Sequence, residues 1–247
     1  STLGSTLNNN PTGTVNVTGN TSVVGNVTNT SASATAVTVA AGTTLTTPEL
    51  DNDAGTVALV GALSGNLSNA AGATVNVTTG TGSVSGTTNN FGMITSGGTL
   101  TGTVTNQATG TLALTNGAST GGVVFNQGGI VTVTGAATVG SVFSANNAAS
   151  TTINAGANLT TTRFDNNGTA NLQVNGTLTG PLMNTTTGAT VNVASSGTVT
   201  GTISNVGTMG SAGDLQGAVT NTGALTLLAG STLGSTLNNN PTGTVNV

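Results

Sequence analysis

Short runs in which aliphatic and small polar residues alternate recur along the whole chain. The residues TLTGTVTNQATGTLALTNG, from Thr99 to Gly117, show the unit: an alternating run that ends on Asn106, a turn that contains glycine, and a second run, Leu112-x-Leu114. Alternation with a period of two is typical of strands that bury one face. The sequence therefore predicts a protein made of many short strands.

These units, which we call rungs, align on one asparagine that lies two residues after the apolar end of an alternating run. A glycine-rich turn and a second short strand follow each asparagine. At the one rung where no asparagine fits the spacing, we expect Ala145 or Asn146 to fill the place. The aligned asparagines are Asn9, Asn29, Asn52, Asn69, Asn90, Asn106, Asn126, Asn166, Asn184, Asn205, Asn221 and Asn239.

A longer repeat encloses the rungs. Residues 231–247 read STLGSTLNNNPTGTVNV, and so do residues 1–17, so the period is 231 − 1 = 230 residues. Twelve rungs in 230 residues give about 19 residues per rung. Within the period, the segment Gly72–Val77 recurs as Gly188–Val193, which indicates two half-repeats of about 115 residues. We expect one continuous domain over residues 1–247, in which 1–230 form one tandem period and 231–247 begin the next.

A rung of this size cannot bury its own apolar face, and stacking of rungs along one axis solves the problem. Stacked strands are about 4.8 Å apart, so twelve rungs span about 58 Å. Aliphatic residues then form interior columns, and the aligned asparagines form a ladder of amide hydrogen bonds. The alternative for the asparagines is the ordinary preference of this residue for turns. The predicted fold class is all-β, a parallel β-helix or β-solenoid.

The rung pattern L-x-G-x-V-x-N…G-x-L-x-L resembles the repeats of filamentous haemagglutinin-type adhesins and related large secreted exoproteins. The resemblance covers essentially the whole chain. It implies a right-handed parallel β-helix that is exported to the bacterial cell surface or the extracellular space. The chain departs from that family in having almost no charge and in its near-identical long period, which are closer to giant repetitive surface fibres.

Composition removes most enzyme classes. The chain has no Cys and no His, and its single cation is Arg163, with five acidic residues and a net charge of −4. Ser-His-Asp and Cys-His catalysis and the common zinc sites are therefore not available. Nucleic-acid binding needs clustered Lys and Arg, so we expect none. No stretch has the length and apolarity of a membrane-spanning helix, and we expect no membrane insertion and no cofactor.

One acidic cluster stands out. Glu49, Asp51 and Asp53 alternate with Leu50 and Asn52, which on a strand places the three carboxylates on the solvent face. The cluster has three interpretations: a solvated acidic surface, a weak calcium site built from oxygen ligands, or a carboxylate pair of a glycosidase. In the second half-repeat the equivalent places hold Arg163, Asp165 and Asn167, and we expect Arg163 and Asp165 to form a surface ion pair of little energetic value.

Abundant threonine raises the question of an ice-binding face, which needs a regular outward array of Thr. The residue before the apolar end of each alternating run gives one outward column, and that column is irregular: Thr6, Asn26, Glu49, Asn66, Thr87, Thr103, Val123, Val142, Arg163, Pro181, Thr202 and Ala218. Several Asn-x-Ser/Thr triplets, the acceptor sequence for N-glycosylation, occur as well. In a chain so rich in these residues the triplets arise by chance.

Two functions remain. The first is a non-enzymatic structural segment, the stalk or fibre of a very long secreted surface protein or matrix protein, whose partners are neighbouring identical repeats joined covalently or stacked end to end into fibres. The second is a ligand-binding solenoid that uses one face for glycan, calcium or ice.

Overall fold

In a computed structural model that describes residues 1–145 and 148–247, the chain forms a parallel β-solenoid of about 13 turns with roughly 19 residues in each. This confirms the predicted fold class. The described residues contain no helix, and hence none that is long and apolar enough to cross a membrane. The chain divides into two compact units, Ser1–Val123 and Val124–Val247, and strand β17 (Ser119–Gln127) contributes residues to both.

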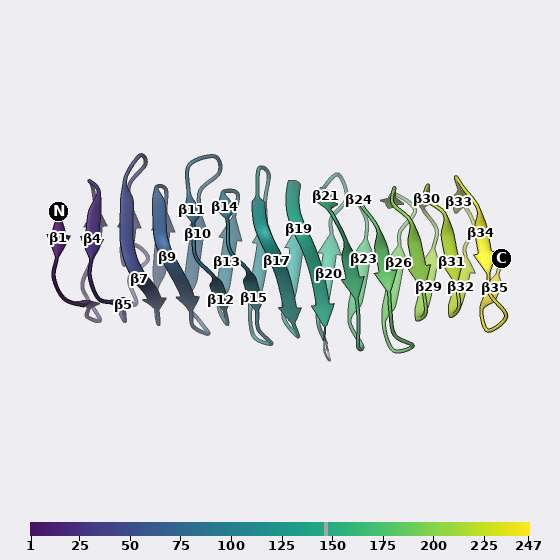
Figure 1. Cartoon of the computed structure of the whole chain (residues 1–247), viewed down its shortest axis with the longest axis horizontal. Coiled ribbons are helices and arrows are strands. Elements are labelled where there is room, and N and C mark those ends of the chain that lie inside the picture. The colour runs from purple at the N-terminus through teal and green to yellow at the C-terminus, as the bar shows by residue number, and fades with distance from the viewer. Residues whose placement is uncertain (146–147) are drawn as a thin grey trace. The chain divides into compact units, whose positions relative to one another are not determined.

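Each turn of the first unit contributes strands to two sheets (Figure 1). The strands of the first sheet are β1 (Thr2–Leu3), β2 (Leu7–Asn9), β4 (Thr21–Val23), β5 (Val27–Asn29), β7 (Thr44–Asn52), β9 (Ala62–Asn69), β11 (Ser83–Val84), β12 (Thr88–Asn90), β14 (Thr99–Leu100) and β15 (Val104–Asn106). The strands of the second sheet are β3 (Val15–Val17), β6 (Val37–Val39), β8 (Thr56–Leu59), β10 (Thr74–Val77), β13 (Met93–Ser96) and β16 (Thr111–Leu114).

The second unit has the same two-sheet arrangement. Its first-sheet strands are β19 (Ala136–Ala145), β21 (Asn158–Thr161), β22 (Phe164–Asn166), β24 (Thr177–Thr179), β25 (Leu182–Asn184), β27 (Thr198–Val199), β28 (Ile203–Asn205), β30 (Asp214–Leu215), β31 (Val219–Asn221), β33 (Thr232–Leu233) and β34 (Leu237–Asn239). Its second-sheet strands are β18 (Ile130–Val133), β20 (Ser150–Ile153), β23 (Asn171–Val174), β26 (Thr190–Val193), β29 (Thr208–Ser211), β32 (Ala224–Leu227) and β35 (Thr244–Asn246).

Parallel pairing in register builds the core. In the second sheet of the first unit, Val57, Val75, Ile94 and Leu112 lie beside one another on successive strands, and all four are fully buried. The alternate residues face solvent, as the period of two in the sequence predicts. Burial of such a side chain contributes about 1.5–3 kcal/mol, so these columns supply the main stabilisation of each rung.

Two rungs carry one extra residue between their apolar positions, Leu45 to Leu50 in the first half-repeat and Leu159 to Phe164 in the second, and both accommodate it in the same way. In β7 the register with β9 shifts between Thr46 and Glu49, and the buried Thr47 hydroxyl donates to the Glu49 carbonyl oxygen at 3.1 Å. In the second half-repeat, the Thr161 hydroxyl donates to the Arg163 carbonyl oxygen at 2.9 Å. The threonine hydroxyl takes the place of the backbone hydrogen bond between strands that the bulge disrupts.

A glycine follows each of these bulges in the next turn. Gly65 and Gly180 have φ values of 155° and 132°, and a Cβ atom on either residue would collide with the carbonyl oxygen of the buried threonine, Thr47 or Thr161. Only glycine meets both requirements, the positive φ and the close approach of two backbones.

One rung differs from the sequence prediction. Strands β19 and β22 pair so that Ser144 lies beside Asn166, which makes Ser144 the residue in the ladder position. The prediction that Ala145 fills this place is wrong, and Asn146 lies outside the described residues. Ser144 is 115 residues after Asn29, so the second half-repeat carries Ser at the place where the first carries Asn.

At this rung the strand pairing also changes one residue in the outward column, the column of residues that precede the apolar end of each alternating run. Val142 lies beside Phe164 and is buried, so it is a core residue, and Ser141 takes the outward place at this rung. The sequence alignment failed here because no asparagine marks the rung and because Val142 and Phe143 are both apolar. The column stays irregular after the correction.

Candidate functional site

The asparagine ladder of the first unit is a row of side-chain hydrogen bonds inside the solenoid. Each Nδ2 atom donates to the Oδ1 atom of the asparagine one rung later, and the side chains are buried. The distances are 2.7 Å for Asn9 to Asn29, 2.8 Å for Asn29 to Asn52, 2.9 Å for Asn52 to Asn69, 2.9 Å for Asn69 to Asn90 and 2.8 Å for Asn90 to Asn106. All five bonds run in the same direction along the chain.

Each ladder amide also satisfies backbone carbonyls where the chain turns from one sheet to the other. The Asn69 Nδ2 atom donates to the Ala73 carbonyl oxygen of its own turn at 3.3 Å and to the Met93 carbonyl oxygen of the next rung at 3.1 Å. A buried carbonyl without a donor costs about 1–3 kcal/mol. The asparagine therefore holds the turn of its own rung and the adjacent rung together.

In the described part of the second unit the ladder continues, with a break at Ser144. The Nδ2–Oδ1 distances are 3.0 Å for Asn166 to Asn184, 2.7 Å for Asn184 to Asn205, 2.8 Å for Asn205 to Asn221 and 2.8 Å for Asn221 to Asn239. Asn126 donates to the Ser150 carbonyl oxygen at 3.0 Å. At Ser144 the row breaks, because the shorter side chain does not donate to Asn166.

Chemically, the ladder is inert. Amides neither titrate nor act as nucleophiles near neutral pH, and a neutral donor–acceptor group can stack on copies of itself, whereas a column of aspartates at about 4.8 Å would repel. The geometry is therefore that of a structural element.

The acidic cluster lies on the solvent face, as the alternation predicts. Glu49 and Asp51 are half-buried, Asp53 is exposed, and Leu50 and Asn52 between them are buried. Desolvation by partial burial raises the pKa of Glu49 above its ordinary value of 4.5, and the negative charge of Asp51 raises this pKa further. Among the described residues, no three His, Cys, Asp or Glu side chains lie close enough to hold a metal ion together. The calcium interpretation therefore gains no support from the geometry.

The equivalent place in the second half-repeat holds an ion pair. Arg163 Nε donates to Asp165 Oδ1 at 2.8 Å, with the Arg163 side chain 55% exposed and the Asp165 side chain 12% exposed. The single cation of the chain is therefore engaged with a carboxylate. Because the Arg163 side chain is more than half exposed, solvent screens the pair, which contributes about 0–1 kcal/mol although Asp165 is mostly buried.

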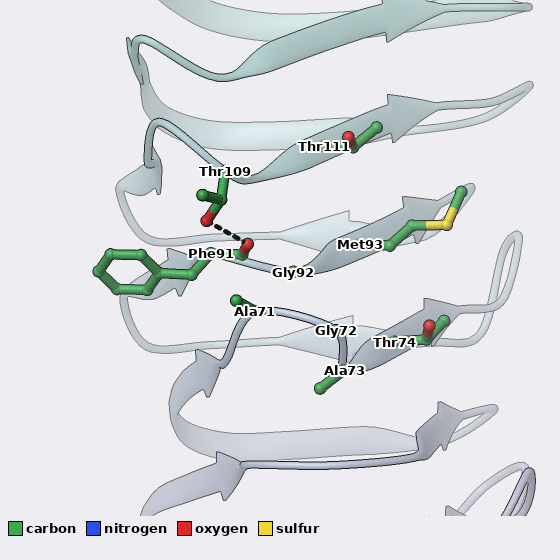
Figure 2. Close-up of a pocket in the computed structure, with 9 residues that line it drawn as sticks. All are labelled: Ala71, Gly72, Ala73, Thr74, Phe91, Gly92, Met93, Thr109 and Thr111. Atoms are coloured by element: carbon green, nitrogen blue, oxygen red, sulfur yellow. Dashed lines mark hydrogen bonds between the residues drawn. The ribbon is translucent and has the colours of Figure 1, made fainter.

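Sequence reasoning missed a shallow hollow of about 380 Å³ on the first unit. Figure 2 shows the Phe91 ring at a turn and the Met93 side chain on the strand that follows it. These side chains are 40% and 46% exposed, and the Phe91 carbonyl oxygen accepts a hydrogen bond of 2.8 Å from the Thr109 hydroxyl. The available signal was that Phe91 stands where the other half-repeat has Val206. The hollow contains no charged group.

An aromatic pair on the second unit was missed as well. The rings of Phe125 and Phe143 meet edge to face, with centroids 5.9 Å apart and an angle of 66° between the planes. These residues directly precede Asn126 and Ser144, so the pair packs on the outer face of the rungs at the ladder break. Such a pair contributes about 0.5–1.5 kcal/mol beyond its buried area.

No protein-family model matches the sequence, and no curated protein matches it. Among solved structures, the chain is similar to a crystal structure of a hyper-glycosylated fragment of TibA whose glycosylation is catalysed by TibC. The two sequences are 18% identical, the alignment covers 98% of this chain and 94% of that chain, and the TM-score is 0.48. A likeness of this degree gives no information about binding or location.

Proposed function

We propose that the chain is a non-enzymatic structural segment, the stalk or fibre-forming part of a very long secreted surface or matrix protein. One observation carries the proposal. The 17-residue rung at 1–17 and its identical copy at 231–247 form corresponding strands in two contexts. These are β1, β2 and β3 in the first copy and β33, β34 and β35 in the second, with β35 shifted by one residue relative to β3. The rung therefore fits the rung that follows it and the rung that precedes it.

A tandem array can continue through this rung without a special joint. Twelve rungs at about 4.8 Å extend each period by about 58 Å. Buried columns and the ladder fasten each rung to the next, so the properties of the segment are extension and rigidity. Its partners are the neighbouring identical repeats of the same array.

The sequence has no His and no Cys, which supports a role without catalysis. Its single Arg side chain, Arg163, pairs with Asp165, which supports a role without nucleic-acid binding. A stacked surface rich in Thr and Asn, with only six charged side chains in the whole sequence, suits a long secreted fibre, and we place the protein outside the cell or on the cell surface on this basis. The described parts of the chain contain neither a regular outward column nor a cluster of ligating side chains. Glycan, ice or calcium binding therefore has less support than this role.

The test is electron microscopy and fibre diffraction of a chain with several 230-residue periods. The proposal expects a meridional spacing near 4.8 Å and a longer period near 58 Å. Compact particles that lack both spacings would refute it. A fibre whose length does not grow with the number of periods would also refute it.

A further inference from the structure

Three asparagines of the chain are followed directly by glycine: Asn116, Asn167 and Asn175. In such a pair the backbone nitrogen of the glycine can attack the side-chain amide carbon of the asparagine, and glycine hinders the attack least because it has no side chain. Asn167 and Asn175 both lie in the second unit, and Gly-Thr follows each of them. Since the residues that follow are the same, a difference in reactivity between these two sites is set by the fold.

The turn at Asn167 brings the reacting groups into contact. Asn167 directly follows the ladder residue Asn166, and the Ala170 nitrogen donates to the Asn167 carbonyl oxygen at 3.1 Å across the turn. Gly168 has a φ of 66°, and its nitrogen donates to Asn167 Oδ1 at 2.7 Å. The amide carbon Cγ is bonded to Oδ1, so the Gly168 nitrogen lies within about 4 Å of the carbon that it would attack.

This contact is confined to the turn. In the described structure the Gly168 nitrogen donates to no group outside the turn, so no hydrogen bond to a neighbouring rung has to break before it attacks. Asn167 and Gly168 are half-buried, which leaves the turn open to hydroxide and water. Reacting groups that are held in contact react faster than groups that must first be brought together. The turn therefore favours ring closure at Asn167.

The second pair is held in the opposite way. Gly176 is buried, and its nitrogen donates to the Ile153 carbonyl oxygen of the preceding rung at 3.1 Å. Asn175 Oδ1 accepts from the Gln173 amide at 2.8 Å, and the Asn175 carbonyl oxygen accepts from the Ser196 hydroxyl at 2.7 Å. Attack by the Gly176 nitrogen therefore requires that a contact between two rungs breaks first.

We propose that Asn167 is a site of spontaneous modification, at which the folded chain converts an asparagine into aspartate and isoaspartate. Hydroxide removes the Gly168 N–H proton, and the nitrogen forms a bond to Asn167 Cγ. The Cγ–Nδ2 bond then breaks as the leaving nitrogen takes a proton from water, which releases ammonia and returns the hydroxide. In this step the side-chain amide is the group attacked, and the nucleophile is the backbone nitrogen.

The product of ring closure is a five-membered cyclic imide, which water opens. Water adds to one of the two imide carbonyl carbons, and the bond from that carbon to the Gly168 nitrogen breaks. Addition at Cγ gives aspartate, and addition at the backbone carbonyl carbon gives isoaspartate, whose chain runs through Cγ. In sum, one water is consumed and one ammonia is released, and no oxidant or cofactor takes part.

The first half-repeat shows that the aspartate product fits this turn. Asp53 stands at the place where the second half-repeat has Asn167. The Asp53 nitrogen donates to the Asn29 carbonyl oxygen at 2.8 Å, and the Asn167 nitrogen donates to the Ser144 carbonyl oxygen at the same distance. A carboxylate at position 167 is therefore compatible with the backbone of the rung.

Isoaspartate is not compatible with it, because its chain contains one more carbon atom between residues 167 and 168. The extra atom displaces Gly168, whose carbonyl oxygen accepts a hydrogen bond of 2.7 Å from the Thr186 hydroxyl of the next rung. It also lengthens the turn that Asn166 closes by donating from Nδ2 to the Ala170 carbonyl oxygen at 3.2 Å. Formation of isoaspartate should therefore weaken the second unit at this rung.

The test compares the two sites in one natural, full-length chain. The protein is incubated at mildly alkaline pH, both folded and in enough urea to remove the β-sheet signal in circular dichroism. A protease that cleaves after Leu172 then separates Asn167 from Asn175, and mass spectrometry detects the replacement of the amide by a carboxylate in each peptide. Chromatography separates the aspartate and isoaspartate forms.

We expect Asn167 to convert at least about tenfold faster than Asn175 in the folded chain. In urea the two rates should be similar, because the fold no longer distinguishes the sites. Equal rates in the folded chain, or faster conversion of Asn175, would overturn the proposal. So would a difference of the same size in urea, since the fold would then not be its cause.

Two variants test the effect of the products on stability. Asn167→Asp supplies the aspartate product alone and should unfold at the same urea concentration as the fresh natural chain. After incubation, the natural chain should unfold at a lower urea concentration, whereas Asn167→Ser, which has no amide at this site, should not change. An equal loss in Asn167→Ser would refute the effect of isoaspartate. This inference concerns one turn of the second unit, so neither outcome bears on the axial spacing that tests the stalk proposal.

Discussion

Ser144 and Asn166 lie side by side in neighbouring rungs, and within the described structure neither Ser144 Oγ nor Asn166 Oδ1 has a hydrogen-bond partner. Both atoms are buried. At the other rungs where the ladder bond is formed, an asparagine amide fills this gap. The break is therefore a local defect in an otherwise regular structure, and it occurs where one half-repeat has replaced Asn by Ser.

Restoring the missing amide should stabilise the second unit. Ser144→Asn places an Nδ2 donor opposite the vacant Asn166 Oδ1, and one such bond contributes about 1 kcal/mol. Thermal or urea unfolding measures the change. Ser204→Asn, on the half-exposed face of β28, is the matched control and should change stability by less than about 0.5 kcal/mol. No gain for Ser144→Asn would contradict the conclusion that the missing amide weakens the solenoid at this rung.

Removing an interior ladder residue should have the opposite effect. Asn69→Ala deletes the acceptor of Asn52 and the donor to Asn90, and it leaves the Ala73 and Met93 carbonyl oxygens without this amide. We expect a loss of about 3 kcal/mol, since each buried group left unpaired costs about 1–3 kcal/mol. The exposed residue Asn76 supplies the control, Asn76→Ala. Similar unfolding midpoints for the two variants would contradict a structural role for the ladder.

Two buried threonines stand where the core columns need an apolar residue. Thr88 lies between Leu67 and Val104, and neither its hydroxyl nor that of Thr151 has a partner in the described structure. Thr88→Val and Thr151→Val keep the shape and remove the unpaired hydroxyl, so each should raise stability by about 1 kcal/mol. Differential scanning calorimetry measures this gain, and a lower melting temperature would indicate that the hydroxyls bind an internal water.

The glycines behind the two bulges should not tolerate a side chain. Gly65→Ala and Gly180→Ala both force a Cβ atom against a backbone carbonyl oxygen at a positive φ, and we expect losses of about 2–4 kcal/mol. Gly19→Ala is the control, because a Cβ atom there meets nothing within 4 Å. Equal unfolding free energies for Gly65→Ala and Gly19→Ala would refute the role of the bulge.

Stability should depend on pH through Glu49. Burial, and then the charge of Asp51, raise the pKa of Glu49 in the folded chain above 4.5. The folded state therefore binds the proton more tightly than the unfolded state, so the ionised carboxylate lowers stability at neutral pH and this cost disappears as the pH falls through the folded pKa towards 4.5. Glu49→Gln should be more stable than the natural chain by a few tenths of a kcal/mol at pH 7, with a difference that shrinks towards pH 4.5.

High salt distinguishes the two causes of the raised Glu49 pKa, partial burial and the charge of Asp51. In 1 M salt the Debye length is about 3 Å, which screens the repulsion from Asp51 but not the desolvation. Because burial is the larger cause, the difference in stability between Glu49→Gln and the natural chain at pH 7 should become only partly smaller in high salt. A difference that is constant between pH 7 and pH 4.5 would show that Glu49 titrates alike in both states.

The fold was readable from the sequence because one residue marked each rung. The asparagine spacing and the aliphatic pairs, such as Val75 and Val77, fix the register of neighbouring strands without further information. The failure at Ser144 has the same cause, since the spacing has no anchor where the asparagine is missing. Partial burial of Glu49 and the edge-to-face contact of Phe125 with Phe143 depend on the three-dimensional course of neighbouring turns. Alternation along a single strand does not contain this information.

The ladder bonds of the first unit join residues between 16 and 23 positions apart in the chain. Because each rung binds only its neighbours, a pulling force applied along such a stalk would detach the rungs one after another. A detached rung of about 19 residues could lengthen by up to about 65 Å, at about 3.4 Å per extended residue, whereas a folded rung adds only about 4.8 Å. The protein would lengthen under force in steps of one rung, and the rungs not yet detached would keep their structure.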